Sequence, residues 1–251
     1  MGYNYTINKF IVINMKIAFY EVKDWEKEYL TAKLAGNELS FFADALTAGN
    51  IEGAKDCEII SPFIYSNMNR EILAELPALK FISTRSTGFD HIDITDAKTK
   101  NIVVANVPSY GENTVAEHAF ALILTLSRKV FQSLEKVKRG DFSLDGLMGF
   151  DLKGKTLGIV GLGHIGQHVA RIANGFDMNV LAYDVKQDKK LAKKLGLKFV
   201  SLEDLLKNSD IITLHSPLLD STKHMMNSET FKLVKRGAYL INTARGGLIE
   251  T

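Results

Sequence analysis

The sequence predicts an α/β fold built around parallel sheets. Short apolar segments bounded by Gly, Asn or Asp alternate along the chain with longer segments of helical period, and this alternation is typical of βα units. The hydrophobic share of 46% and the charged share of 24% are those of an ordinary globular protein. A chain of 251 residues is long enough for one or two such domains.

The first part of the chain alternates predicted strands with predicted helices. Residues 1–14 are expected to be an N-terminal extension, with translation beginning naturally at Met15. The predicted strands are 15–20, 57–63, 80–85 and 102–107, and the predicted helices are 24–34, 69–76 and 91–100.

One long helix is predicted from residue 114 to about residue 138. Its first half, VAEHAFALILTL, is apolar nearly all round, so we expect it to be buried on most sides and to form the seam between two domains. The polar stretch KVKRGDFSLDGL that follows is expected to form an exposed arm.

The second part of the chain repeats the βα alternation. Ser201 and Asp204 resemble a capping box at the start of its third helix. The predicted strands are 156–161, 179–184, 210–215 and 238–244, and the predicted helices lie near 163–174, 187–195, 202–208 and 228–235.

The net charge and the cysteine content limit the kinds of partner and of cell compartment that fit this protein. Thirty-one Lys and Arg residues against 29 Asp and Glu residues give a net charge of +2, so no strong field attracts nucleic acid or a membrane surface. A small-molecule partner fits better. The single cysteine, Cys57, lies in an apolar run, which favours a buried, inert thiol and a reducing cytoplasm. Apolar stretches stay below the roughly 18 residues that a membrane helix needs.

A glycine-rich motif, GLGHIG at residues 161–166, follows one predicted strand and opens a helix. Its glycines, Gly161, Gly163 and Gly166, permit a tight turn, a close approach to a pyrophosphate and packing of helix on strand. The helix N-terminus adds amide donors for the phosphates. The motif therefore predicts a dinucleotide site.

Asp184 supports this interpretation because it ends the next strand, 184 − 166 = 18 residues after the motif. A carboxylate there binds the adenosine ribose and repels a 2′-phosphate, which favours NAD over NADP. Lys186, Lys189 and Lys190 lie close by and weaken that preference. The alternative is a strand-end aspartate that only caps the following helix.

Arg245 follows the last predicted strand, where the carboxyl edge of a parallel sheet meets a ligand crevice. A guanidinium at that edge is suited to pair bidentately with a substrate carboxylate or to polarise a carbonyl. The alternative is an exposed arginine in a surface ion pair.

The chain resembles the D-isomer-specific 2-hydroxyacid dehydrogenase family from about residue 60 to its end. Five motifs carry the resemblance in the family's order: STGFDHID (86–93), VPSYGENTVAEHA (107–119), VGLGHIGQ (160–167) with Asp184, LHSPLLDSTKHMMN (214–227) and KRGAYLINTARGGLIET (235–251). The resemblance implies a flavodoxin-like substrate domain at residues 15–112 and a Rossmann-type, doubly wound NAD-binding domain at residues 113–251, incomplete at its C-terminus. It places the active site in the cleft between them and implies a homodimer formed through the long helix and the arm.

The resemblance also assigns roles to single residues. Arg245 matches the catalytic arginine, and Thr87 and Gly88 match the turn that holds the substrate carboxylate. Tyr110 matches a substrate-contacting tyrosine of the D-lactate dehydrogenase branch, although Gly111 and Glu112 depart from that branch. Besides the glycines and Asp184, the matching cofactor positions are Ile165, His215, Pro217, Thr243 and Ala244. His164 lies in the glycine-rich motif itself and is interpreted as a neighbour of the cofactor phosphates.

The remaining histidines are expected to be structural or solvent-facing, and no metal is expected. His118 is interpreted as a packing residue and His168 as solvent-facing, and His224 as structural. His91 replaces an Asn common in the family turn. None of the histidines is expected to be the proton donor.

In the family, hydride passes from NADH to a 2-oxo acid while a histidine held by a carboxylate protonates the oxygen. Both groups lie downstream of the arginine motif, and this chain ends 251 − 245 = 6 residues after Arg245. We therefore expect a truncated gene product, an incomplete sequence or a fragment, with negligible turnover alone. The alternative function is a catalytically silent NAD-binding sensor or corepressor-like module. Among enzymes, phosphoglycerate or hydroxypyruvate reduction rivals D-lactate formation, toward which Tyr110 tilts only slightly.

Overall fold

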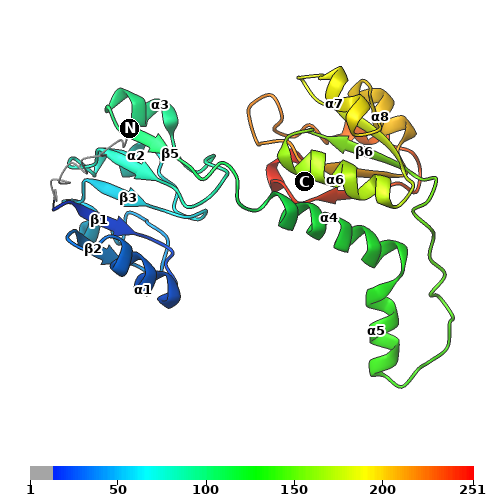
Figure 1. Cartoon of the computed structure of the whole chain (residues 1–251), viewed down its shortest axis with the longest axis horizontal. Coiled ribbons are helices and arrows are strands. Elements are labelled where there is room, and N and C mark those ends of the chain that lie inside the picture. The colour runs from blue at the N-terminus through cyan, green and yellow to red at the C-terminus, as the bar shows by residue number, and fades with distance from the viewer. Residues whose placement is uncertain (1–13) are drawn as a thin grey trace, which may run out of the picture. The chain divides into compact units, whose positions relative to one another are not determined.

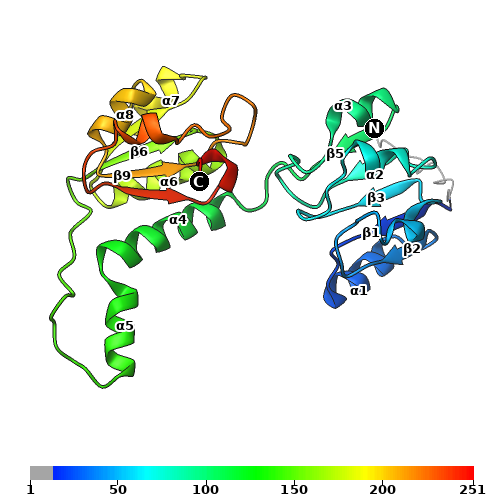
Figure 2. The same ribbon diagram turned by 180° about the vertical axis from the view of Figure 1, so that it is seen from behind.

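A computed structural model describes residues 14–251, which fall into two compact units, residues 14–110 (unit 1) and 111–251 (unit 2). Each unit is built on a parallel five-stranded sheet (Figures 1 and 2). The predicted α/β class is therefore confirmed. The expected N-terminal extension lies outside the described residues, apart from Asn14.

The sheet of unit 1 has the strand order β2-β1-β3-β4-β5, which is that of flavodoxin-like folds. All four strands predicted in this part are present, and β2 is an additional edge strand. The strands are β1 (Lys16–Phe19), β2 (Glu38–Phe41), β3 (Ile59–Ser61), β4 (Phe81–Ser83) and β5 (Val103–Ala105). The helices are α1 (Asp24–Lys33), η1 (Ile51–Ala54), α2 (Arg70–Ala74) and α3 (Ile94–Thr99).

Alternation along β1 distributes the core of unit 1 over both faces of the sheet. Ile17 and Phe19 pack into one buried cluster, and Ala18 packs into another with Ile60 and Met68. Successive side chains of a strand point to opposite faces, so a strand covered on both sides is apolar throughout.

Helix α3 starts later than the predicted residue 91. The side chain of Asp93 accepts a hydrogen bond from the backbone N–H of Asp96, which makes Asp93 the N-cap. His91 consequently lies before the helix, in the loop that follows β4.

The sheet of unit 2 has the order β10-β9-β6-β7-β8, which is the Rossmann order with β6 as its first strand. The predicted strands are again present, and β8 is an additional edge strand. The strands are β6 (Thr156–Val160), β7 (Asn179–Tyr183), β8 (Leu197–Phe199), β9 (Ile211–Leu214) and β10 (Tyr239–Asn242). The helices are α4 (Glu112–Ser127), α5 (Val130–Lys138), α6 (His164–Gly175), α7 (Lys189–Lys194), α8 (Leu202–Asn208), α9 (Ser228–Phe231) and η2 (Gly246–Leu248).

Two buried clusters cover the two faces of the unit 2 sheet. Ile159 of β6 packs with Phe120 of α4 and Val169 of α6, whereas Val160 of β6 packs with Leu205 of α8. The sheet is therefore enclosed between helices, which leaves its carboxyl edge as the natural place for a ligand.

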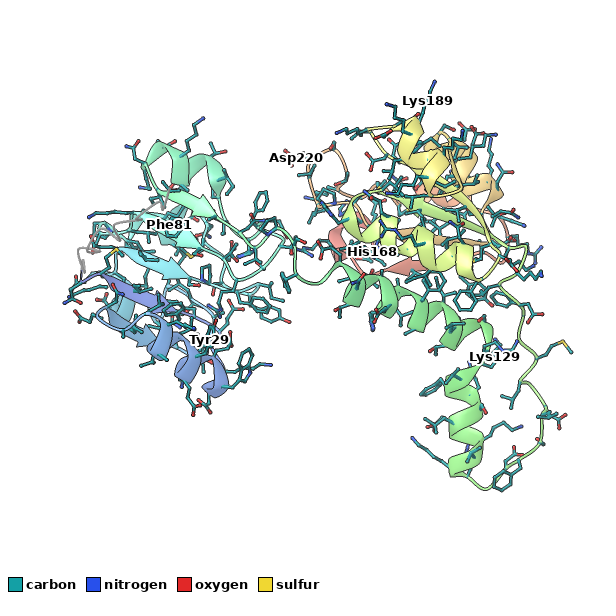
Figure 3. The ribbon with its side chains drawn as sticks, in the orientation of Figure 1. Tyr29, Phe81, Lys129, His168, Lys189 and Asp220 are labelled. Atoms are coloured by element: carbon teal, nitrogen blue, oxygen red, sulfur yellow. The ribbon has the colours of Figure 1, made fainter. Side chains whose placement is uncertain are left out.

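The single long helix predicted from residue 114 to about 138 is wrong, because the structure contains two helices with a bend between them. Lys129, at the bend, has a left-handed backbone with φ of 54° (Figure 3). The backbone N–H of Phe150 donates to the carbonyl of Ser127 at 3.0 Å, so a returning segment takes an acceptor that a continuous helix would use. Helix α4 also buries only one face, with Ala116, Phe120 and Ile123 inside.

The segment from residue 130 to residue 148 includes the predicted arm (136–147) together with helix α5. This whole segment is called the arm from here on, and it carries many exposed apolar side chains. Helix α5 has no buried residue, and it projects away from the sheet of its own unit (Figure 1). The exposed apolar residues of the arm are Val130, Phe131, Leu134, Val137, Phe142, Leu144 and Met148. Large exposed apolar patches are typical of interaction surfaces.

Within residues 14–251, every helix is either too short or too polar to cross a bilayer.

Candidate functional site

The nucleotide site predicted in unit 2 lies where the strand order of the sheet reverses. Strands β7 and β9 flank β6 on its two sides, so the segments after β6 and β9 diverge at this point and open a crevice. Gly161 follows β6 and His215 follows β9. They are close in space, because a Cβ built on Gly161 would lie 2.8 Å from the His215 carbonyl carbon.

The three glycines of the motif each meet a different steric demand. Gly161 has φ of +95°, a conformation that other residues rarely adopt. A Cβ on Gly166 would lie 2.2 Å from the carbonyl oxygen of Gly161, so only glycine lets α6 pack on the loop. A Cβ on Gly163 would meet no atom within 4 Å, so this glycine faces the open space that a ligand needs.

The N-terminus of α6 is left without a side-chain cap. Gly163 is the N-cap residue and has no side chain to accept the first-turn amides. His164 is exposed, and Ile165 is half-buried against the core. The free amides and the positive end of the helix dipole suit a pyrophosphate.

Asp184 contacts the glycine-rich loop directly. One carboxylate oxygen accepts the backbone N–H of Leu162 at 2.7 Å, and the other accepts the backbone N–H of Lys186 at 2.8 Å. The side chain thus fixes the loop as well as the turn after β7. A carboxylate has about four lone-pair positions, so two remain for the hydroxyls of a ribose.

Two polar atoms in this crevice are buried without a hydrogen-bond partner among residues 14–251. They are Nδ1 of His215 and Oγ1 of Thr243, from segments that follow the paired strands β9 and β10. Buried polar atoms are almost always paired, so these two fit a site that a polar ligand completes.

The His215 ring is neutral at physiological pH. Burial lowers its pKa to about 4, because a charged imidazole loses its hydration there. Its Nε2 contacts Oγ1 of Thr213 at 2.9 Å. A neutral ring lets Nδ1 or Nε2 serve as an acceptor, which His⁺ does not.

Two more of the sequence-predicted cofactor residues follow the same strands, β9 and β10. Pro217 is exposed, and its carbonyl accepts the hydroxyl of Thr222. Ala244 is half-buried, and its N–H donates to the side chain of Asn242. Together with the loop, the orphaned atoms and Asp184, these residues fit an adenine dinucleotide.

Arg245 lies at the carboxyl edge of the same sheet, directly after β10. It is half-buried, and its Nη1 donates to the carbonyl of Ala244 at 3.0 Å. Its own carbonyl accepts Nδ2 of Asn242 at 2.9 Å. The guanidinium is thereby attached to the edge where the sequence predicts substrate.

In unit 1, the turn at Ser86–Gly88 follows β4 and has an unusual distribution of hydrogen bonds. Its three carbonyl oxygens all accept: Val107 N–H donates to Ser86, Asn106 Nδ2 to Thr87, and Ser86 Oγ to Gly88. By contrast, the amides of Thr87 and Gly88 donate to no other residue within 14–251. A turn whose carbonyls are all bonded and whose amides remain available as donors suits an anion.

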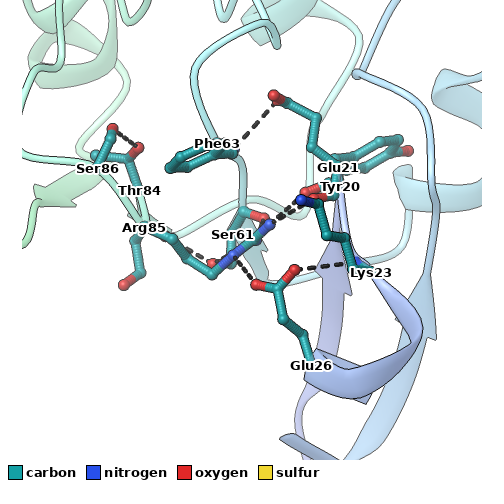
Figure 4. Close-up of polar contacts among 10 residues, drawn as sticks. Tyr20, Glu21, Lys23, Glu26, Ser61, Phe63, Thr84, Arg85 and Ser86 are labelled. Atoms are coloured by element: carbon teal, nitrogen blue, oxygen red, sulfur yellow. Dashed lines mark hydrogen bonds and ion pairs between the residues drawn. The ribbon is translucent and has the colours of Figure 1, made fainter.

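Arg85 and Glu21, which the sequence reasoning did not single out, organise the sheet edge beside this turn (Figure 4). The Glu21 carboxylate accepts the backbone N–H groups of Phe63, Tyr65 and Ser66 and the hydroxyl of Ser66. Burial opposes its charge, but these hydrogen bonds outweigh burial and hold the Glu21 pKa below its ordinary value. Glu21 also has φ of 60°, an uncommon backbone for a residue with a side chain.

The sequence contained one signal for Arg85: a cation at the end of an apolar strand, immediately before a glycine-containing turn. Glu21 gave no such signal, because its partners lie more than 40 residues away along the chain. His91 also joins this region, since its Nε2 lies 3.2 Å from Oγ1 of Thr84. Tyr110 is exposed at the end of unit 1.

No cluster of three or more His, Cys, Asp or Glu side chains suited to a metal ion occurs within the described part of the chain.

Comparison with known proteins agrees with this geometry. The sequence model of the D-isomer specific 2-hydroxyacid dehydrogenase NAD-binding domain matches residues 120–251. A 2-hydroxyacid dehydrogenase homolog of Zymomonas mobilis is 40% identical over 242 residues, which are 94% of this chain and 73% of that protein. The D-lactate dehydrogenase of Escherichia coli is 37% identical over 241 residues, with the same two shares, 94% and 73%.

Solved structures give the same result. The D-lactate dehydrogenase of Aquifex aeolicus, complexed with NAD and lactic acid, is similar with a TM-score of 0.89 and 40% identity, covering 93% of this chain and 70% of that one. Unit 2 of the chain is thus an NAD-binding domain, and NAD is the cofactor. The chain belongs to the D-isomer specific 2-hydroxyacid dehydrogenase family of NAD-dependent oxidoreductases.

Proposed function

We propose that this protein interconverts a small 2-oxo acid and the corresponding D-2-hydroxy acid with NAD. The observation that carries the proposal is the turn after β4, whose Thr87 and Gly88 amides donate to no residue within 14–251 while its carbonyls are all bonded. A substrate carboxylate completes those two amides. Arg245 supplies the cationic group that, beside these neutral amides, orients a 2-oxo acid.

Each residue then has a defined task. NAD supplies the hydride acceptor or donor when it is bound. Thr87 and Gly88 hold the carboxylate, and Arg245 polarises the carbonyl oxygen on which negative charge develops. Tyr110 contacts the substrate side chain. The glycine-rich loop holds the pyrophosphate, and Asp184 holds the adenosine ribose.

Pyruvate and D-lactate are the first substrate pair to test. Several similar proteins are named D-lactate dehydrogenases, and Tyr110 favours the same branch. The rival is another small 2-oxo acid, since a similar protein of Korarchaeum cryptofilum is named glyoxylate reductase.

Among the steps of the reaction, proton transfer to the substrate oxygen is the one that residues 14–251 support least. His215 is the histidine best placed in the nucleotide crevice, but its pKa of about 4 leaves it neutral near pH 7, whereas a general acid needs a pKa near the working pH. We therefore expect the 251-residue chain to bind NADH and to turn over very slowly.

This expectation is tested with the purified chain in two measurements. NADH binding is measured by titration calorimetry, with NADPH as the control ligand, and NADH oxidation is followed with pyruvate, hydroxypyruvate and glyoxylate. We expect binding of NADH in preference to NADPH and negligible oxidation. Absence of NADH binding to the folded chain would refute the proposed function, and rapid oxidation would refute the argument on proton transfer.

We also propose that the protein is a homodimer through α4 and the arm, and that it is cytoplasmic. The exposed side chains of Phe131, Leu134 and Met148 support the dimer, because a second copy would remove them from water. Replacing Leu134 by Glu is expected to shift the mass measured by light scattering from dimer to monomer. A wild-type chain that stays monomeric at micromolar concentration would contradict this proposal.

A further inference from the structure

Arg85 occupies the point in the unit 1 sheet where the strand order reverses. In the order β2-β1-β3-β4-β5, the segments after β1 and β3 diverge, and a ligand crevice is expected there. The guanidinium of Arg85 fills this position (Figure 4). Its Nη1 donates to the carbonyl of Ser61 at 2.6 Å, and its Nη2 donates to the carbonyl of Tyr20 at 2.7 Å.

Every nitrogen of the guanidinium has a partner. Nη2 also donates to the carbonyl of Glu21 at 3.2 Å, and Nε lies 3.4 Å from Oε1 of Glu26. The side chains of Arg85 and Glu26 are only 19% and 20% exposed. An arginine fork is suited to hold several acceptors at fixed angles, and a lysine is not.

These contacts of Arg85 also balance the negative charge at this edge of the sheet. Without Arg85, this edge would present the carboxylates of Glu21 and Glu26 together with strand-end carbonyls, all of which repel an anion. Arg85 compensates for these groups. The adjoining turn, rather than the crevice between β1 and β3, is then left as the site for an anion.

Arg85 is connected to that turn through the backbone. Its N–H donates to the carbonyl of Pro62 at 3.0 Å, and Ser86 and Thr87 follow it directly. The residue before it, Thr84, contacts Oγ of Ser86 at 2.7 Å. Both the main chain and the side chain of Arg85 are therefore fixed to the ends of β1 and β3, immediately before the amides of Thr87 and Gly88.

We propose that Arg85 is a positioning residue for substrate: by tying the ends of β1 and β3 to the end of β4, it sets the Thr87 and Gly88 amides to receive the carboxylate of a 2-oxo acid. This inference rests on the proposed function. Arg85 itself does not contact the substrate, since the strand-end carbonyls and Glu26 occupy its donors.

The test measures binding of oxamate, a 2-oxo acid mimic that accepts no hydride, to the 251-residue chain saturated with NADH. Ligand-observed NMR gives the affinity, and calorimetry gives the NADH affinity of the same variants. Arg85→Met is expected to weaken oxamate binding about tenfold or more, the effect of disordering charge-assisted hydrogen bonds, with NADH affinity unchanged. Arg85→Lys is expected to resemble Arg85→Met, because a lysine keeps the charge but not the fork.

Two control variants distinguish a positioning role of Arg85 from the effects of lost charge and of lost stability in unit 1. Arg70→Met removes an arginine of the same unit that pairs with Asp96, so it repeats the change in charge away from the turn. Ile51→Ala destabilises the buried core of the same unit. Urea unfolding followed through Trp25, the only tryptophan, compares the stability of unit 1 among the variants. Both controls are expected to bind oxamate like the wild type under conditions where unit 1 is folded.

Several results would overturn the inference. Native oxamate affinity in Arg85→Met would show that the turn needs no such support. Restoration by Arg85→Lys, or an equal loss in Arg70→Met, would show that charge alone matters. An equal loss in Ile51→Ala would show that only the stability of unit 1 matters. If the wild-type chain with NADH binds no oxamate, the proposed function fails, and this inference fails with it.

Discussion

Replacing Gly166 with alanine is expected to abolish detectable NADH binding. The new Cβ would lie 2.2 Å from the carbonyl oxygen of Gly161 and 3.2 Å from its carbonyl carbon. These are backbone atoms, so they cannot move aside as a flexible side chain would. Helix α6 must shift away from the loop, which moves its first-turn amides out of position for the pyrophosphate. Calorimetric titration with NADH measures the loss.

The matched control is Gly175→Ala at the other end of the same helix. A Cβ on Gly175 would meet no atom within 4 Å, and alanine is favoured over glycine in a helix by roughly 0.5–1 kcal/mol. We expect this variant to bind NADH normally and to unfold at a slightly higher temperature. Normal NADH binding by the Gly166→Ala variant would contradict the packing role assigned to this glycine.

Replacing Asp184 with alanine is expected to weaken NADH binding by about tenfold or more, because two effects combine. The ribose loses its acceptor, and the backbone N–H of Leu162 loses the carboxylate that holds it at 2.7 Å. Fluorescence titration with NADH measures the change. NADPH binding is expected to remain weak, since removal of the negative charge does not restore the shape of the loop.

Asp188→Ala provides the comparison for Asp184. The Asp188 carboxylate also accepts two backbone N–H groups, those of Lys190 and Leu191, but it caps α7. This variant is expected to lose a helix cap, at a cost of about 1 kcal/mol, and to bind NADH normally. If Asp188→Ala and Asp184→Ala weaken NADH equally, the effect belongs to the general stability of this region.

The fold was largely predictable because most of its strands can be recognised from the apolar pattern of their own residues. Segments such as TLGIV at β6 and IITL at β9 are mostly buried and apolar apart from one threonine each, which is the pattern typical of a parallel strand covered on both faces. The edge strands β2 and β8 were not predicted because they lack this pattern. Their segments, ELSF and LKF, each expose a polar residue and contain no buried residue.

The bend at Lys129 was not predictable from helical period, because its cause is distant in the sequence. The stretch from residue 114 to residue 138 keeps its apolar period through the bend, and the acceptor at Ser127 is taken by Phe150, 23 residues further on. Tertiary contacts override local propensity in this way.

In the candidate site, too, residues set by a local sequence pattern were predictable, and residues that act through distant contacts were not. Glycines and Asp184 were predictable, since their spacing is dictated by one βαβ unit. The support around the unit 1 turn was not, because Arg85 and Glu21 act through carbonyls and amides of segments that have no characteristic residue type. The roles of Thr87, Gly88, Tyr110 and Arg245 remain predictions that the variants above and substrate binding will test.

The Asp184 carboxylate holds the backbone of both Leu162 and Lys186, and this affects any attempt to change the coenzyme preference. Discrimination against a phosphorylated ribose and the shape of the phosphate-binding backbone depend on one side chain, so they cannot be altered independently by a single substitution. A successful redesign would have to install a replacement acceptor for Leu162 together with a cationic partner for the extra phosphate. Serine is the natural first choice for the acceptor, with Val185 or Lys186 as the neighbouring position at which to adjust the charge.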